Sequence, residues 1–458
     1  MRSTIVSVLV LDRSPDWNRL VRMIDRGTRA VPRFRHRLTA VPFGLAPPRW
    51  VPDREFDVRW HLRRIALPPP GEFAAVLEFA RVEAMTAFDP ARPLWQFTLL
   101  EGLAQGRTAL VFKVHHSLTD GIGGIRIAGE MLDLVRAGTA REPVPEPEAD
   151  GAGVLGDIVS WNSALAVDLM RGGVAAVLPV LGRVATDPAR AVRDGLALGG
   201  SLLRLVRPIT RTLSPLMTGR GLGRAMAVLE VPLDDLRTGA HRAGCTTNDA
   251  FLAAVLLGIR AYHDRHGAHL PGLRVAMPIS LRKDGDPLGG NRITLARFEV
   301  PLGDTGPVAL ERELDAIVRT WRQEPAVPLS NAVAAAFNRL PTGLLTDMFK
   351  HVDLVASDVP GSPVPLYVAG AEIERIYAFG PTTGTSLNVT LVSHAGMCCV
   401  GINADTSAVP DLPNLTDCIA AGFRTIVRLG DTEPDAAPDR PRVHPARRAD
   451  RRIPSGER

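Results

Sequence analysis

Cysteine is scarce in this sequence: only four occur among 458 residues, at Cys245, Cys398, Cys399 and Cys418. So few thiols exclude a disulfide-stapled scaffold of the kind found in small secreted proteins. Two of the four are adjacent and no C-x-x-C spacing occurs, which argues against a cysteine-based zinc site. The usage suits a reducing compartment, and we predict a cytoplasmic location.

Long apolar runs are also lacking. No stretch of about 18 apolar residues occurs, so no membrane-spanning helix is predicted. The first twelve residues contain one arginine and a very short apolar run, with no small-residue cleavage site after it, which is not the pattern of a signal peptide. Alternation of apolar residues over 4–11 predicts a buried strand instead.

Aromatic residues make up only 5% of the chain and are not interleaved with basic segments, so no nucleic-acid partner is expected. The chain is nevertheless basic, with a formal net charge of +5 and a pI near 9.4. Only three of the 54 basic residues are lysine. The positive charge fits an anionic lipid surface or a phosphorylated cofactor equally well.

The composition is otherwise that of a globular protein, with 45% apolar and 22% charged residues, and the length predicts two domains. The first is expected over 1–138 and the second over 226–430. In the first we expect strands at 4–11, 97–100 and 109–114 and helices at 15–28 and 73–85. In the second we expect strands at 273–278, 294–300, 352–356 and 386–392.

The segment between these domains, 139–225, has a different composition. Residues 139–153 are proline-rich and typical of a linker. Residues 151–225 contain nine arginines, four aspartates and no glutamate, a net charge of +5, among many apolar residues. We predict short helices that bind an anionic membrane or lipid-droplet surface; packing against the rest of the protein is the alternative. The proline- and arginine-rich tail, 431–458, is predicted to be disordered.

The strongest chemical signal is a His-His-x-x-x-Asp-Gly motif over 115–121, which follows an apolar strand and precedes an apolar helix. Histidine is suited to proton transfer near neutral pH. Alternation allows only one of His115 and His116 to face a substrate. Asp120 is expected to cap the helix or pair with an arginine, and so to fix the turn that ends at Gly121.

Three other interpretations of this motif are open. A metal site would need further ligands at helical spacing, which are lacking, so no metal is expected. A His-x4-Asp acyltransferase of the glycerol-phosphate type would need phosphate-binding motifs downstream, and none is found. The histidine pair could also simply be a polar cap on the strand end, although the glycine-rich turn makes this less attractive.

The motif is the signature of the chloramphenicol acetyltransferase-like fold, which includes peptide-synthetase condensation domains. Together with further motifs along the chain, it makes the sequence resemble the bacterial wax ester synthase/diacylglycerol acyltransferase family from about residue 5 to 430. The further motifs are Pro93-Leu94-Trp95, Thr247-Asn248-Asp249, Pro278 to Arg282, Leu288 to Arg292, Ser357 to Gly361, Pro365-Leu366-Tyr367, Leu387 to Thr390, Gly401 and Asp405. One departure is Asp358, where the family more often has asparagine.

The resemblance implies an α/β fold with mixed (α+β) sheets, in two chloramphenicol acetyltransferase-like domains joined by a long helical linker. It implies direct transfer from acyl-CoA, as co-substrate and without a permanently bound cofactor, to diacylglycerol or a long-chain alcohol. The second histidine, His116, would be the general base, with His115 and Gly121 supporting the motif and Asp120 holding the loop.

Residues at the start of a predicted helix are the remaining candidates. Asn248 and the helix dipole could stabilise developing negative charge, whereas Asp249 is expected to cap the helix. Another hydroxyl acceptor, or a non-catalytic lipid-surface protein, is the alternative function. The absence of a Gly-x-Ser-x-Gly elbow and of a P-loop agrees with direct transfer.

Overall fold

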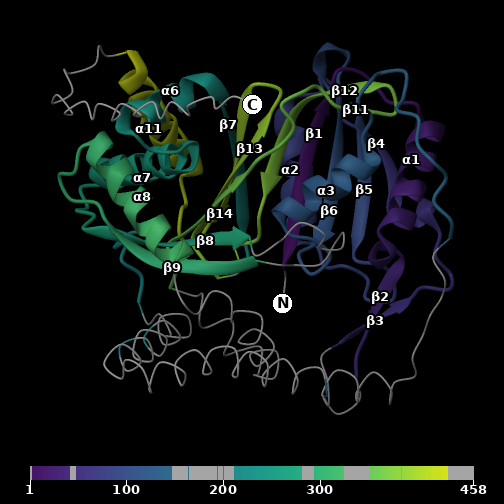
Figure 1. The fold of residues 1–458 in the computed structure, drawn as a ribbon, viewed down its shortest axis with the longest axis horizontal. Coiled ribbons are helices and arrows are strands. Elements are labelled where there is room, and N and C mark those ends of the chain that lie inside the picture. Colours follow the sequence, from purple (N-terminus) through teal and green to yellow (C-terminus); the bar gives the residue numbers. More distant parts are fainter. Residues whose placement is uncertain are drawn as a thin grey trace, which may run out of the picture.

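Two mixed six-stranded sheets, lying side by side, form the framework of the molecule (Figure 1). The computed structural model describes residues 3–41, 48–146, 163, 193, 200, 211–280, 293–323, 351–382 and 384–431. The predicted basic helices over 154–224 and the predicted disordered tail therefore lie mostly outside the described residues. In the described part of the chain, no helix is long and apolar enough to cross a membrane.

The first sheet is built mainly from the N-terminal part of the chain. In spatial order its strands are β11 (Tyr367–Val368), β12 (Ala371–Phe379), β1 (Thr4–Leu11), β6 (Thr108–His115), β5 (Trp95–Glu101) and β4 (Leu62–Ala66). Its helices are α1 (Trp17–Ala30), α2 (Phe73–Met85) and α3 (Gly121–Met131). A small hairpin of β2 (His36–Thr39) and β3 (Arg49–Pro52) and the short helices η1 (Pro32–Arg35), η3 (Val58–His61) and η4 (Ala104–Gly106) complete this part.

The alternation of β1 sorts these helices onto two faces. Val6, Val8 and Val10 belong to one apolar cluster with α2, whereas Leu11 belongs to another with α1 and α3. The predicted bounds of β1 and α2 are those of the structure, and β6 extends one residue beyond each predicted end. Thr4, at the start of β1, lies opposite His115, at the end of β6. The histidine pair therefore lies where these two inner strands of the sheet end.

The second sheet carries its helices on one face. In spatial order its strands are β7 (Arg224–Pro232), β14 (Met397–Asp405), β13 (Leu387–His394), β10 (Leu354–Val359), β8 (Gly272–Ser280) and β9 (Ile293–Pro301). The helices are α6 (Leu233–Ala243), α7 (Thr247–Arg265), α8 (Pro307–Arg322) and α11 (Leu412–Asp431). Every residue from Asp249 to Ile259 is buried, because α7 lies between the sheet, α8 and α11.

The second half of the chain contributes strands to both sheets. β11 and β12 come from the second half of the chain but complete the first sheet, with Val6 of β1 opposite Phe379 of β12. The two sheets are also joined across their faces. There the Tyr377 hydroxyl and the Arg375 guanidinium of β12, in the first sheet, both donate to Glu230 of β7, in the second sheet. Residues of both sheets also share one apolar cluster, which includes Val6 and Val8 of β1 and Cys399 of β14.

One carboxylate lies inside the second core. Glu311 of α8 is fully buried, and neither of its oxygens has a hydrogen-bond partner. Burial, together with the charge of Asp249 at the start of α7, raises the pKa of Glu311 to about 7. The sequence analysis missed this residue, although Glu311, Leu314 and Val318 share one helical face and a charge on such a stripe is a usable signal.

We predict that Glu311 makes the protein less stable as pH rises. Its folded-state pKa lies above the ordinary value of 4.5, so the folded protein keeps a proton that the unfolded chain releases. The stabilisation is complete below about pH 4.5 and is lost as pH approaches 7. Glu311→Gln should remove this loss, and the variant should gain on the order of 3 kcal/mol over the wild type between pH 5 and 8.

The measurement is chemical denaturation of both proteins across that pH range. Taking the difference between variant and wild type cancels the buried histidines His61, His263 and His394, whose pKa values are lowered by burial and whose effect has the opposite sign. Glu313→Gln, on the same helix but only half-buried, is the matched control and should follow the wild type. A difference that stays flat with pH would contradict the prediction.

Candidate active site

The histidine motif forms a tight turn between β6 and α3. The strand ends at His115, and the backbone N–H of His116 donates to the Ser3 carbonyl at 2.8 Å. Asp120 is 1% exposed, and its Oδ1 accepts from the N–H of Gly123 at 2.7 Å, which makes it the N-cap of α3. The turn is therefore held at both ends, by the sheet and by the helix cap.

His115 lies on the face of the sheet that α2 covers. It shares this face with Lys113, whose ammonium group donates to Glu83 of α2 at 2.9 Å. Its ring stands edge-on to Phe88, with centroids 6.1 Å apart, and its Nδ1 lies 2.7 Å from the Ser117 hydroxyl. These contacts give His115 a packing role within the turn.

The environment of His116 favours the neutral imidazole. Burial lowers its pKa, because the charged form loses solvation, and the nearby Asp120 carboxylate only partly offsets this. A neutral imidazole near pH 7 is the form that can accept a proton. Burial thus favours the form of His116 that can accept a proton.

The start of α7 is the second part of the site. Thr246 and Asp249 form a capping box, in which Asp249 Oδ2 accepts from the Thr246 N–H at 2.9 Å and from its hydroxyl at 2.6 Å. Asp249 is therefore a cap, as expected. Asn248 is half-buried in the first turn, with its Nδ2 3.5 Å from Asp249 Oδ1. It stands where the positive end of the helix dipole is strongest.

The end of β10 lies against both of these segments. A Cβ placed on Gly121, the first residue of α3, would lie 3.0 Å from Cγ2 of Val359. The preceding residue, Asp358, is close enough to Asp249 for the two charges to interact; burial first and this charge second raise its pKa to about 6. The structure thus brings the His116 turn, the end of β10 and the start of α7 into one region.

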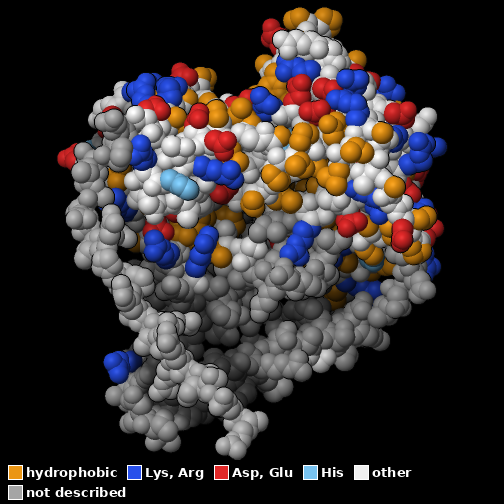
Figure 2. Space-filling view, turned by 45° about the horizontal axis from the view of Figure 1, so that its top comes forward, with side chains coloured by type: hydrophobic (Ala, Val, Ile, Leu, Met, Phe, Trp, Pro, Cys, Tyr) orange, Lys and Arg blue, Asp and Glu red, His pale blue; other side chains and the backbone are white. Residues whose placement is uncertain are grey.

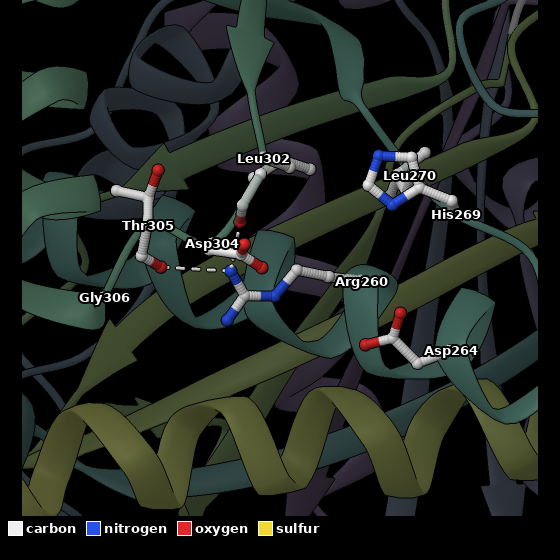
Figure 3. Close-up of a pocket in the computed structure, with 9 residues that line it drawn as sticks. Arg260, Asp264, His269, Leu270, Leu302, Asp304, Thr305 and Gly306 are labelled. Carbon is white, nitrogen blue, oxygen red and sulfur yellow. Dashed lines mark hydrogen bonds between the residues drawn. The ribbon is translucent and has the colours of Figure 1, made fainter.

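One cavity lies in the second half of the chain, away from this region. It has a volume of about 360 Å³ and is lined by Arg260, His269, Asp304 and neighbouring residues (Figure 3). The Arg260 guanidinium donates to the Gly303 and Thr305 carbonyls and so holds the loop before α8. Arg260 lies twelve residues beyond Asn248 on the same helix, roughly 18 Å along its axis. This cavity is separate from the histidine turn.

Within the described ranges, no three His, Cys, Asp or Glu side chains are grouped so that they could hold a metal ion.

Comparison with known proteins identifies the family of this chain. The sequence matches the wax ester synthase/diacylglycerol acyltransferase catalytic domain over residues 5–251 and the C-terminal domain of that family over 289–427. A Mycobacterium tuberculosis H37Rv protein that carries a diacylglycerol O-acyltransferase name is 33% identical over 462 residues, covering 97% of this chain and 90% of its own. A second protein of that strain with the same enzyme name is 30% identical over 419 residues, covering 87% of this chain and 88% of its own.

Solved structures show the same fold. The wax ester synthase/diacylglycerol acyltransferase from Marinobacter aquaeolei VT8 superposes with a TM-score of 0.61 at 22% identity, covering 94% of this chain and 96% of its own. The first condensation domain of the CDA synthetase superposes with a TM-score of 0.59 at 16% identity, covering 95% and 92%. The mixed-sheet fold predicted from the motif is thus confirmed. The chain belongs to the wax ester synthase/diacylglycerol acyltransferase family, a family of acyltransferases.

Proposed function

We propose that the protein transfers an acyl group from acyl-CoA to the hydroxyl of diacylglycerol or of a long-chain alcohol, with His116 as general base. One observation carries the proposal: an imidazole whose pKa is lowered by burial sits on a capped turn where the two halves of the molecule meet. Such a group accepts protons at neutral pH, and its position gives access to substrates held between the halves.

The reaction needs no covalent enzyme intermediate. The His116 imidazole takes the hydroxyl proton as the alcohol oxygen attacks the thioester carbonyl, and a tetrahedral oxyanion forms. When this intermediate collapses, the C–S bond breaks and the imidazolium returns its proton to the CoA thiolate. The products are an ester and free CoA, and His116 is again neutral.

The neighbouring residues have supporting roles in this proposal. Asn248, beside the N-terminus of α7, contributes its amide and the helix dipole to stabilise the oxyanion. Asp120 acts through geometry, because its carboxylate is used in capping α3 and keeps the turn rigid. Gly121 allows α3 to approach Val359 closely, which sets the distance between the turn and the second half of the molecule.

The acceptor is tested by CoA release from palmitoyl-CoA with diacylglycerol, with hexadecanol and with no acceptor. We expect release that depends on one or both of the lipid alcohols, with the matching triacylglycerol or wax ester as product. Release with another hydroxyl compound alone would move the protein to a different acceptor. No release with any acceptor would leave a lipid-binding homologue without activity and would contradict the proposal.

The base is tested by comparing His116→Ala with His115→Ala. Loss of a general base typically lowers the rate by about 10²–10⁴, so His116→Ala should fall by that factor in kcat. His115→Ala should lose mainly thermal stability, because its ring packs on Phe88. In the wild type, the acid limb of the rate profile should lie below the ordinary histidine pKa of 6.5, since burial lowers that of His116. Near wild-type turnover in folded His116→Ala would remove the assignment.

We also propose that the protein associates peripherally with an anionic lipid surface. The acceptors are insoluble in water, and the segment 154–224, most of which lies outside the described residues, combines apolar and basic residues. On the face drawn in Figure 2, apolar side chains gather in a patch that is bordered by both basic and acidic side chains. Leu134, Val135 and Val364 are exposed, and the pairing of Asp133 with Tyr367 keeps these segments close together.

Co-sedimentation with vesicles that contain anionic lipid tests this association. Each basic residue near such a surface contributes about 1 kcal/mol, and salt screens the attraction. Binding should therefore be seen at low salt and fall as salt rises. A variant with fewer arginines in this segment should bind more weakly than the wild type. It has glutamine at several of Arg183, Arg190, Arg193, Arg204, Arg207 and Arg211. Binding that is absent at low salt, or that is unchanged in the variant, would overturn this part of the proposal.

A further inference from the structure

Asp358 stands at the end of β10, on the face of the second sheet that the helices cover. Its register partner on β13 is Leu391. Leu391 and Ala356, which lies two residues before Asp358, both belong to the apolar cluster that contains the buried residues of α7. The next residue, Val359, therefore points to the opposite face, where it meets Gly121 of the histidine motif. β10 thus places a carboxyl group directly behind the contact that joins the two halves of the molecule.

A second carboxyl group, that of Asp249, lies close to Asp358 at the start of α7. Asp249 Oδ2 is fixed there as an acceptor, from the Thr246 N–H at 2.9 Å and from the Thr246 hydroxyl at 2.6 Å. The charge of Asp249 acts on Asp358 and also on Glu311, which is fully buried in α8. Carboxyl groups from β10, α7 and α8 thus surround the start of one helix.

The groups around Asp358 favour its neutral form. Burial first, and the charge of Asp249 second, raise the pKa of Asp358 to about 6. Cys398 of β14 also lies close to Asp358, and burial, followed by this charge, raises the pKa of its thiol to about 12, so the thiol is neutral. Arg237 of α6 acts on Cys398, but its side chain is 55% exposed and lies 3.5 Å from Asp234. Asp358 is therefore protonated in weakly acidic solution and ionised in weakly alkaline solution.

We propose that Asp358 supports acyl transfer as a neutral carboxylic acid, and that its ionisation opposes the oxyanion at the start of α7. The inference rests on the proposed function, in which Asn248 and the dipole of α7 stabilise that oxyanion. An ionised Asp358 adds a negative charge beside the same helix start. Inside a protein, two like charges about 10 Å apart repel enough to slow a reaction roughly 10-fold. The neutral acid avoids this repulsion, and so would the asparagine that the family more often has at this position.

The pH dependence of kcat/KM in Asp358→Asn and in the wild type tests the inference, with CoA release as the assay. Asparagine has nearly the shape of the protonated acid but cannot ionise. The ratio of variant to wild type should stay near one at pH 5 and rise to roughly 10 at pH 8, with a midpoint near pH 6. Taking the ratio cancels the titration of His116, which both proteins retain. Asp235→Asn, at an exposed carboxylate on α6, is the matched control and should follow the wild type at every pH.

Asp358→Ala separates the effect of charge from that of packing. It removes the same charge together with the packing contacts of the side chain. A loss that comes from packing is independent of pH, so the ratio of this variant to the wild type should still rise roughly 10-fold between pH 5 and pH 8. A ratio that is flat with pH in either Asp358 variant would overturn the inference.

Melting temperatures show independently whether Asp358 titrates in this range. Its folded-state pKa lies above the ordinary value of 3.8, so the wild type should lose stability relative to Asp358→Asn as pH rises from about 4 to about 6. A difference that is the same at pH 4 and pH 7 would also overturn the inference. Wild-type CoA release separates the two proposals: its absence at every pH contradicts the proposed function and with it this inference, whereas release with a flat ratio contradicts the inference alone.

Discussion

The close approach of Gly121 to Val359 is the contact on which the site depends. The first residue of α3 lies so near the end of β10 that a Cβ there would be only 3.0 Å from a valine methyl carbon. The Val359 side chain would have to move by a few tenths of an ångström to admit even the methyl group of alanine. Because Asp120 ties that helix start to the histidine turn, the position of His116 relative to the second half of the molecule follows from this contact. The glycine of the motif is thus a spacer between the two halves.

Burial of ionisable groups near this contact explains the direction of their pKa shifts. Burial shifts the pKa values of three groups there, in a direction that depends on which form is charged. It lowers the pKa of His116, which keeps that imidazole neutral, and raises the pKa of Asp358 to about 6 and that of Glu311 to about 7. In each case the neutral form is favoured. Direct acyl transfer benefits from such a place, because a base, an oxyanion and a leaving thiolate are handled without competition from bulk water.

Sequence reasoning could predict what depends on local pattern. β1 and α2 have their predicted bounds, and the histidine turn, with Asp120 as a cap, follows from residues close together in the chain. The presence of β11 and β12 in the first sheet could not be predicted in this way. β12 pairs with β1, which lies more than 360 residues away in the chain. The apolar alternation of a strand does not show which other strand it pairs with.

The same distinction separates the residues that the sequence missed. Glu311 stands on an apolar helical stripe and could have been noticed, but its lack of partners depends on how α8 packs against the start of α7. The environment of Asp358 was missed as well, because its approach to the Asp249 carboxylate depends on how β10 meets the start of α7. Such environments arise from tertiary contacts, so a residue count or a motif cannot show them.

A double-mutant cycle at the Gly121–Val359 contact tests the central claim most directly. The quantity measured is kcat/KM for the wild type, Gly121→Val, Val359→Ala and the double variant, with melting temperatures to confirm folding. The account predicts that Gly121→Val lowers kcat/KM by about 10-fold or more while the protein stays folded, and that Val359→Ala restores most of the loss, because the two residues share one space. Full activity in Gly121→Val, or losses in the two variants that simply add, would contradict it.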